Sequence, residues 1–140
     1  MRISIAVLLL IPALAFGAPG LWFDPARPGH GLSISQPTEG RHAVLWHLYT
    51  RDGAPTWVIA EPCSSFPCVT PLFAPTANWL GGGFELGDEI GSLELRPDGD
   101  NLRAVFDLRG LSPDECAGIT PGGLLFRECV GTITFVRLAD

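Results

Sequence analysis

The residues that could perform chemistry gather before the first predicted strand. The stretch GLWFDPARPGHG, residues 20–31, contains Asp24 and His30. Ser33 and Ser35 follow in the chain, so a serine, a histidine and a carboxylate are present by type. Residues this close in one strand and its leading loop rarely converge on one another. There is also no G-x-S-x-G motif, and the carboxylates are scattered, so we predict no catalytic residue.

A metal site is the second chemistry to consider. His30 with His42 or His47, and Asp24 as a third ligand, would form a set of two histidines and one carboxylate. His42 and His47 are five residues apart on one predicted strand, so they should face opposite sides of the sheet. The spacing therefore does not support a metal site, and we predict His47 to be a core or rim histidine.

Turn chemistry explains most of the loop between residues 24 and 31. Asp24 can accept backbone hydrogen bonds, prolines fix φ, and glycines permit a close approach of other backbone. The residues in these roles are Asp24, Pro25, Pro28, Gly29 and Gly31. We therefore favour a structural role for this loop. Turn chemistry does not explain Arg27 and His30, so the loop is also where a binding site would first be sought.

Aromatic residues are the other candidates for binding. The chain has four tryptophans, Trp22, Trp46, Trp57 and Trp79, together with Tyr49. They could line a pocket or fill the core of a small β-domain, and we favour the core because tryptophan and phenylalanine dominate core packing in such domains. The predicted ligand-binding residues are Trp22, Asp24, Arg27, His30, Trp46, Tyr49 and Trp57.

These residues must be positioned by short strands. The chain contains 17 glycines and 13 prolines, and no long segment has helical periodicity. Residues 31–36, 42–50 and 55–60 predict a meander, and residues 89–110 predict a hairpin with Leu102, Ala104, Phe106 and Leu108 on one face. Residues 124–138 predict one or two further strands, and residues 111–123 a loop. Around Leu72 and Phe73 the prolines allow at most a short edge strand. The fold class is all-β, a small antiparallel barrel or barrel-like sandwich of about seven or eight strands.

The N-terminal segment and the net charge indicate the cellular compartment and exclude some classes of partner. Residues 1–17 are typical of a secretory signal peptide, with Arg2 before an apolar run that is too short to span a membrane as a helix. Residues 18–140 then form one β-domain. The net charge of −6, without a basic patch, argues against nucleic acid and anionic membrane surfaces as partners. We expect a periplasmic or secreted protein.

Four cysteines follow the apolar run, and export would make disulfides the default. Three connectivities are possible. We favour Cys63–Cys68 and Cys116–Cys129, because each pair brackets a short loop rich in proline, glycine or serine. Neither spacing is the C-x-x-C knuckle of a zinc site.

Two stretches resemble a group of secreted proteobacterial β-domains. GLWFDPARPGHG fits the opening G-x-W-[FY]-[ND]-P followed by G-x-G, and WHLYTRDGAPTW, residues 46–57, fits W-x-x-Y-x-x-x-G-x-P-x-W. The sequence departs from the pattern at Pro28, where serine is usual, and at His47, where an aromatic residue is usual, which points to a local specialisation at His47. The opening G-x-W also resembles lipocalin and avidin barrels, in which a tryptophan closes one end.

These observations predict an exported, non-enzymatic binding module for a small molecule, glycan or peptide, without a cofactor. One alternative is a periplasmic protein-interaction domain, such as a hydrolase inhibitor, that presents the Cys63–Cys68 loop to an envelope protein. A third is a metal-dependent enzyme centred on His30. A deep aromatic pocket would favour the first hypothesis, and a filled core with a projecting disulfide loop would favour the second.

Overall fold

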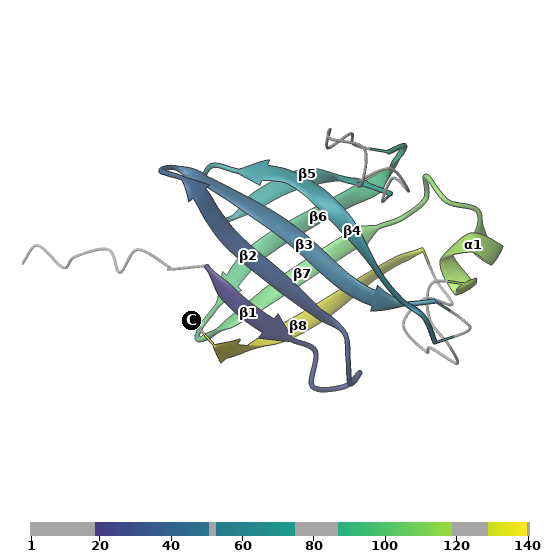
Figure 1. The fold of residues 1–140 in the computed structure, drawn as a ribbon, viewed down its shortest axis with the longest axis horizontal. Coiled ribbons are helices and arrows are strands. Elements are labelled where there is room, and N and C mark those ends of the chain that lie inside the picture. Colours follow the sequence, from purple (N-terminus) through teal and green to yellow (C-terminus); the bar gives the residue numbers. More distant parts are fainter. Residues whose placement is uncertain (1–18, 51–52, 75–86, 119–128, 140) are drawn as a thin grey trace, which may run out of the picture.

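Eight antiparallel strands follow one another in chain order and close into a barrel (Figure 1). The structure is a computed structural model that describes residues 19–50, 53–74, 87–118 and 129–139. The predicted signal peptide, residues 1–17, and Trp79 lie outside the described residues. The strands are β1 (Gly20–Phe23), β2 (Gly31–Thr38), β3 (Arg41–Tyr49), β4 (Pro55–Cys63), β5 (Cys68–Phe73), β6 (Glu89–Asp98), β7 (Asn101–Asp107) and β8 (Val130–Ala139). The predicted all-β fold is confirmed as a closed barrel.

Alternation along the strands sends one set of side chains inward. Leu102, Ala104 and Phe106 of β7 are fully buried, as the hairpin pattern predicts. The inward set fills the interior with large aliphatic and aromatic side chains, and the rings of Trp46 and Phe106 lie 5.4 Å apart, centroid to centroid, inside it. In the described part of the chain the barrel thus encloses a packed hydrophobic core.

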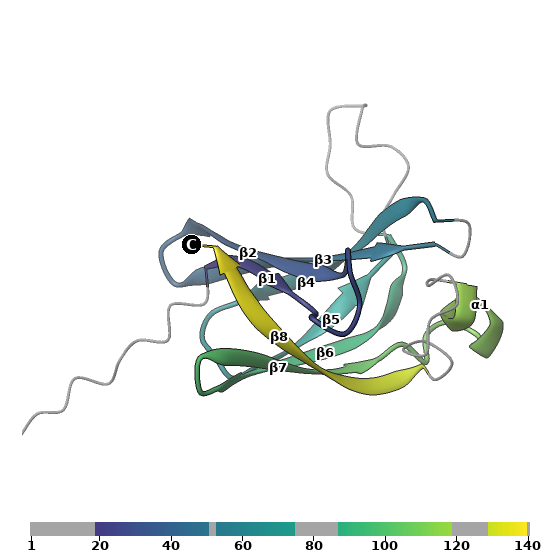
Figure 2. The same cartoon turned by 90° about the horizontal axis from the view of Figure 1, so that it is seen from below.

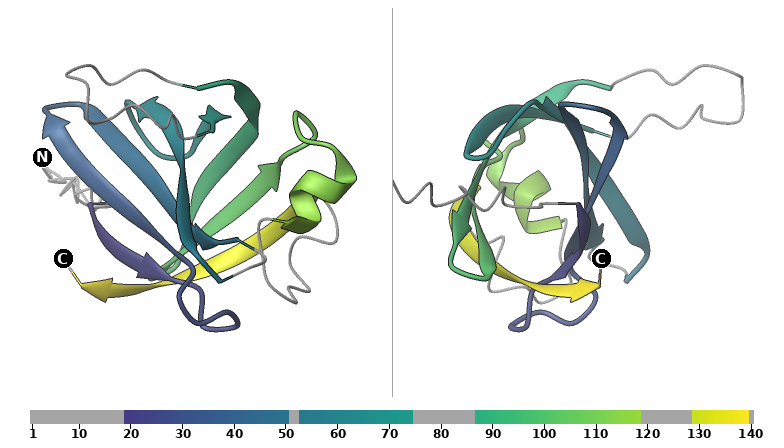
Figure 3. Two further views of the ribbon diagram at one scale, coloured as in Figure 1. Left: turned by 45° about the vertical axis from the view of Figure 1, so that its right-hand side comes forward. Right: turned by 90° about the vertical axis from the view of Figure 1, so that its left-hand side faces the viewer.

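The connections differ between the two ends of the barrel. The end near the first and last described residues carries the turns β2–β3, β4–β5 and β6–β7. The β6–β7 turn is a two-residue hairpin in which Gly99 has a φ of 60°, a conformation that glycine adopts without strain. The opposite end carries the β1–β2 loop and the short helix α1 (Pro113–Gly118). Figure 3 shows the barrel end-on, with α1 beyond the more distant end.

Strand β5 is more complete than its prolines predict. The sequence suggested at most an edge strand around Leu72 and Phe73, but β5 pairs with both β4 and β6. Closure of the barrel removes the free edge. The pairing with β4 is confined to two residue pairs, whereas Pro71 is accommodated opposite Ser92 of β6.

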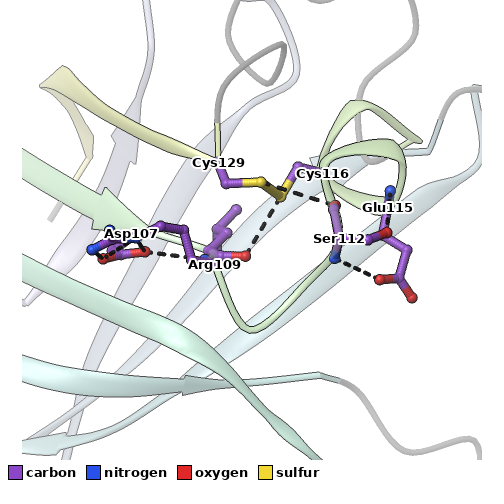
Figure 4. Close-up of a disulfide and its surroundings, with 7 residues drawn as sticks. Asp107, Arg109, Ser112, Glu115, Cys116 and Cys129 are labelled. Atoms are coloured by element: carbon purple, nitrogen blue, oxygen red, sulfur yellow. Dashed lines mark hydrogen bonds and ion pairs between the residues drawn. A yellow bond between two sulfur atoms is a disulfide. The ribbon is translucent and has the colours of Figure 1, made fainter.

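The helix α1 lies within a segment predicted to be a loop, and that prediction is wrong. Ser112 and Glu115 form a capping box: the Ser112 N–H donates to Glu115 Oε2 (2.7 Å) and the Glu115 N–H donates to Ser112 Oγ (3.3 Å) (Figure 4). Pro113 occupies the first helical position, where its missing N–H costs nothing. The disulfide Cys116–Cys129 then ties this helix to the residue before β8.

Both disulfides have the predicted connectivity, Cys63–Cys68 and Cys116–Cys129. Two disulfides are consistent with an oxidising compartment. In the described ranges, no helix is long and apolar enough to cross a membrane.

Candidate functional site

The loop between β1 and β2 closes on itself through backbone hydrogen bonds. The Asp24 N–H donates to the His30 carbonyl (3.0 Å), the Arg27 N–H to the Asp24 carbonyl (3.1 Å), and the His30 N–H to the Arg27 carbonyl (3.1 Å). Asp24 Oδ1 also accepts the Ala26 N–H at 2.9 Å, which is the Asx-turn expected from the sequence. The loop is therefore held in one shape by its own residues.

Asp24 and Arg27 form an ion pair inside this loop. The Asp24 side chain is only 3% exposed, and it accepts a hydrogen bond at Oδ2 from Arg27 Nη1. The Arg27 side chain is 28% exposed, so the pair lies at the border between interior and solvent. A carboxylate this deeply buried needs its cationic partner. Arg27 thus has a structural role that turn chemistry alone did not explain.

His30 is buried beneath the same loop. Its ring lies 6.0 Å from that of Tyr49, centroid to centroid, and Tyr49 also packs against Gly29 so closely that a side chain there would collide with it. Burial lowers the pKa of His30 from its ordinary value of 6.5, with Asp24 opposing this shift and Arg27 adding to it. His30 therefore favours the neutral state in the folded protein.

The lowered pKa makes stability depend on pH. The unfolded chain protonates His30 near pH 6.5, whereas the folded protein does so only at lower pH, so acidification below pH 6.5 favours unfolding. We expect the urea concentration at the midpoint of unfolding to decrease when the pH of the parent protein is lowered from 7.5 to 5. His30→Gln should make this decrease smaller. An unchanged pH dependence in His30→Gln would contradict this role.

The predicted site residues do not converge on one pocket. Trp22 is buried in the core, and the guanidinium of Arg137 on β8 lies 5.4 Å from the centroid of its ring and donates a hydrogen bond to the Pro19 carbonyl (2.6 Å). Trp46 is 1% exposed and belongs to the core. Trp57 alternates with buried Val58 and lies half-buried on the outer face of the sheet. The aromatic residues are thus divided between the interior and the exterior.

The described residues do not support the predicted alternative of a metal centre at His30. Among the residues that the structure describes, no group of three or more histidine, cysteine or acidic side chains lies close enough to hold a metal ion. The hydroxyl of Ser33 lies within hydrogen-bond distance of His47 Nε2.

Among the described residues, a cavity lies on the outer face of β2, β3 and β4. It has a volume of about 690 Å³. Its lining is mostly apolar and consists of Ser35, Ala43, Val44, Leu45, His47, Trp57, Ile59, Ala60, Glu61 and Pro62. The strand register places His47 opposite Trp57 and Leu45 opposite Ile59, so these four side chains form its centre. We call this cavity the outer groove.

A hydrogen bond between two strands supports the outer groove from the side. Ser33 Oγ of β2 lies 2.7 Å from Nε2 of His47 on β3. Both residues are half-buried, and Ser33 pairs with Leu45, two residues from His47. His47 was predicted to be a core or rim histidine, but it lies on the outer face as part of the lining of the outer groove.

The opposite side of the barrel has a different surface. Figure 2 shows β2, β3 and β4 on one side and β6 and β7 on the other. The outward positions of β6 and β7 carry charged residues, including the ion pair between Glu94 and Arg96 and the exposed Arg103. The middle of β3 and β4 instead turns Leu45 and Ile59 outward. The apolar lining is therefore a local property of one side.

Sequence reasoning did not identify the outer groove, although a signal for it exists. In HAVLWHLY, residues 42–49, apolar and aromatic residues occupy both faces of the strand. Since a closed barrel buries only one face, a second apolar face indicates a surface that binds something. Comparison with protein-family models, with curated protein sequences and with solved structures gives no match for this chain.

Proposed function

We propose that the protein is a binding module whose outer groove holds a small molecule with an aliphatic or aromatic body. The observation that carries the proposal is the groove of about 690 Å³ lined by Leu45, Trp57 and Ile59. Small-molecule sites are concave, mostly apolar and of roughly 300–1,000 Å³. The groove meets each of these criteria.

The lining distinguishes between the ligand classes. Only Ser35, His47 and Glu61 contribute polar side chains, and the other lining residues are apolar. A glycan needs many hydrogen-bond partners around its hydroxyl groups, because each buried polar group without a partner costs free energy. An apolar molecule with one polar group suits the groove better, because Trp57 and Ile59 would contact its body and His47, paired with Trp57, would offer a hydrogen-bonding ring to its polar group.

The proposal includes export to the periplasm or the cell exterior. Support comes from the signal-peptide pattern of residues 1–17 and from two disulfides, which persist in oxidising compartments. A carrier or sensor of apolar molecules in that compartment would need no cofactor.

The fluorescence of Trp57 tests the proposal. The purified, disulfide-bonded protein would be titrated with decanoate, decanol, 2-naphthol and cellotetraose. We expect saturable changes with the apolar probes and none with cellotetraose. Trp57→Phe should remove most of the signal, and Trp57→Ala should weaken binding at least tenfold because the ligand loses a wall of the groove.

A matched control separates the groove from general surface hydrophobicity. Leu21 is 46% exposed on the outer face of β1 and does not line the groove. Leu21→Ala should bind decanol as the parent protein does, measured by calorimetry. Equal losses in Leu21→Ala and Trp57→Ala would argue against the groove, and a folded protein that binds none of the probes would refute the function.

A protein-interaction domain is a second candidate, supported by the β4–β5 loop. Ser64, Ser65 and Pro67 are exposed in this loop, while Phe66 packs edge-on against His42 at 5.1 Å between ring centroids. The disulfide Cys63–Cys68 closes the loop at its base. Such a fixed, exposed loop suits insertion into a partner's cleft, since little ordering is lost on binding. Crosslinking of the Ser65→Cys variant to one envelope protein would favour this function, provided that the Arg103→Cys control variant does not crosslink to the same protein.

A further inference from the structure

We propose that Ser33 is a nucleophile activated by His47, and that it accepts the acyl group of an apolar ester held in the outer groove. This inference rests on the proposed function, because the groove must first hold the acyl chain. It adds an acyl-transfer activity to a binding site. The residues that carry it are neighbours on β2 and β3.

The geometry is that of a nucleophile and its base. Ser33 Oγ and His47 Nε2 are 2.7 Å apart, within the range that defines an activated hydroxyl–imidazole pair. His47 lines the groove, and so does Leu45, which is paired directly with Ser33 across β2 and β3. A carbonyl carbon placed at Ser33 would therefore have its acyl chain over Leu45, towards Ile59 and Trp57.

The reaction balances with water as the only other reactant. Ser33 Oγ forms a bond to the carbonyl carbon while Nε2 of His47 takes the hydroxyl proton. The carbon–oxygen bond to the alcohol then breaks, and His47 returns the proton to the departing oxygen. Water, deprotonated by the same nitrogen, later releases the carboxylic acid and regenerates Ser33.

The surroundings of the pair limit the reaction to activated esters. Ser33 is paired with Leu21 of β1 and Leu45 of β3, so its N–H belongs to the sheet and does not form an oxyanion hole. Loss of one oxyanion donor typically costs a factor of about 10²–10³ in rate. His47 also has no carboxylate hydrogen-bond partner within the described ranges. We therefore expect slow turnover and a measurable acyl-enzyme.

The groove contains a matched control for this nucleophile. Ser35 lies two residues further along β2 and lines the groove, but the bond to His47 is made by Ser33. The two serines therefore share a strand and a face, but Ser35 is exposed and Ser33 is half-buried. Only Ser33 is bonded to His47, so acylation of Ser33 in preference to the more accessible Ser35 reports the effect of the base.

The experiment uses p-nitrophenyl butyrate and p-nitrophenyl acetate with the purified, disulfide-bonded protein. Nitrophenolate release would be followed together with the intact mass, and peptide mapping would locate the acyl group. We expect one butyryl group per protein on Ser33, and faster reaction with the butyrate ester than with the acetate ester because the groove holds the longer chain. Ser33→Ala should abolish the adduct, and His47→Gln should slow its formation about a hundredfold. Ser65→Ala, in the exposed β4–β5 loop and outside the groove lining, should react like the parent.

The outcomes separate this inference from the proposed function. Decanol binding without any acylation of Ser33 would overturn the inference and leave the binding function intact. If the folded protein shows neither decanol binding nor acylation, both fail. An adduct that maps to another residue, or that persists in Ser33→Ala, would also overturn it. Peptide mapping of the parent protein gives this answer without reliance on any variant.

Discussion

Replacement of Trp46 by alanine should lower the free energy of unfolding by about 4 kcal/mol. The side chain is 1% exposed and lies against Phe106 in the centre of the barrel. Its removal loses the burial of a large aromatic surface and leaves a cavity that a closed, hydrogen-bonded barrel cannot easily collapse. Urea unfolding followed by far-ultraviolet circular dichroism would measure the change without relying on tryptophan fluorescence.

Trp57→Ala is the counterpart of this variant on the other face of the sheet. Trp57 is half-buried on the outer face, so its loss should cost less than about 1 kcal/mol of stability while removing a wall of the outer groove. The two variants together test whether the tryptophans divide into a core set and a binding set. Equal destabilisation by both, or a stable Trp46→Ala protein, would contradict that division.

This division shows why the sequence predicted the fold better than the site. The strands of the meander and the β6–β7 hairpin follow from alternation and turn residues, and both disulfides follow from the short loops that they bracket. Alternation alone does not say which face of 42–49 is inside when both faces are apolar. The sequence alone therefore could not assign each aromatic residue to the core or to the surface; the strand positions in the closed barrel were needed for that.

The outer groove depends on register, which the sequence leaves open. Ser33 and His47 are 14 residues apart, and they meet because β2 and β3 are aligned with Ser33 opposite Leu45. A shift of one residue would turn one of the two inward. The departure from the resembled pattern at His47 suggested a local specialisation there, which stays a prediction. The structure places His47 in the lining of the outer groove.

Two structural departures have local causes. Strand β5 forms despite its prolines because barrel closure supplies partners on both sides. The helix α1 was missed because proline and glycine around it suggested a loop, although Ser112 and Glu115 have the spacing of a capping box. The helix α1 contributes no residue to the lining of the outer groove, whereas β5 pairs with Ile59 and Ala60 of that lining and so helps to position it.

Residues 20–31 have contacts that stabilise the fold. Asp24, Arg27 and His30 are joined by hydrogen bonds within the β1–β2 loop, and the ring of Trp22 is buried in the core and contacts Arg137. A ligand site at this loop would have to break those contacts. Contacts that close the β1–β2 loop thus explain why Asp24 and His30 occur there. This structural explanation can be tested by measuring how much the loop's ion pair contributes to the free energy of unfolding.

Arg27→Met should destabilise the protein by about 3 kcal/mol, the second large effect we expect. The methionine keeps the aliphatic bulk but leaves the Asp24 carboxylate, 3% exposed, without its cation. Asp24→Asn should cost less, about 1 kcal/mol, because the amide oxygen still accepts the Ala26 N–H and no buried charge is left unpaired. The double variant should be no less stable than Arg27→Met alone, since the charge that Arg27 compensates is gone.

Arg96→Met provides the matched control, because the pair between Arg96 and Glu94 lies on the exposed face of β6. Its loss should change the free energy of unfolding by less than about 0.5 kcal/mol, as is usual for a solvated ion pair. Urea unfolding at pH 7.5 would compare the four variants with the parent. If Arg27→Met were as mild as Arg96→Met, the carboxylate would tolerate the loss of its partner. The β1–β2 loop would then be open enough to serve as a binding site, and the structural explanation of the opening stretch would fail.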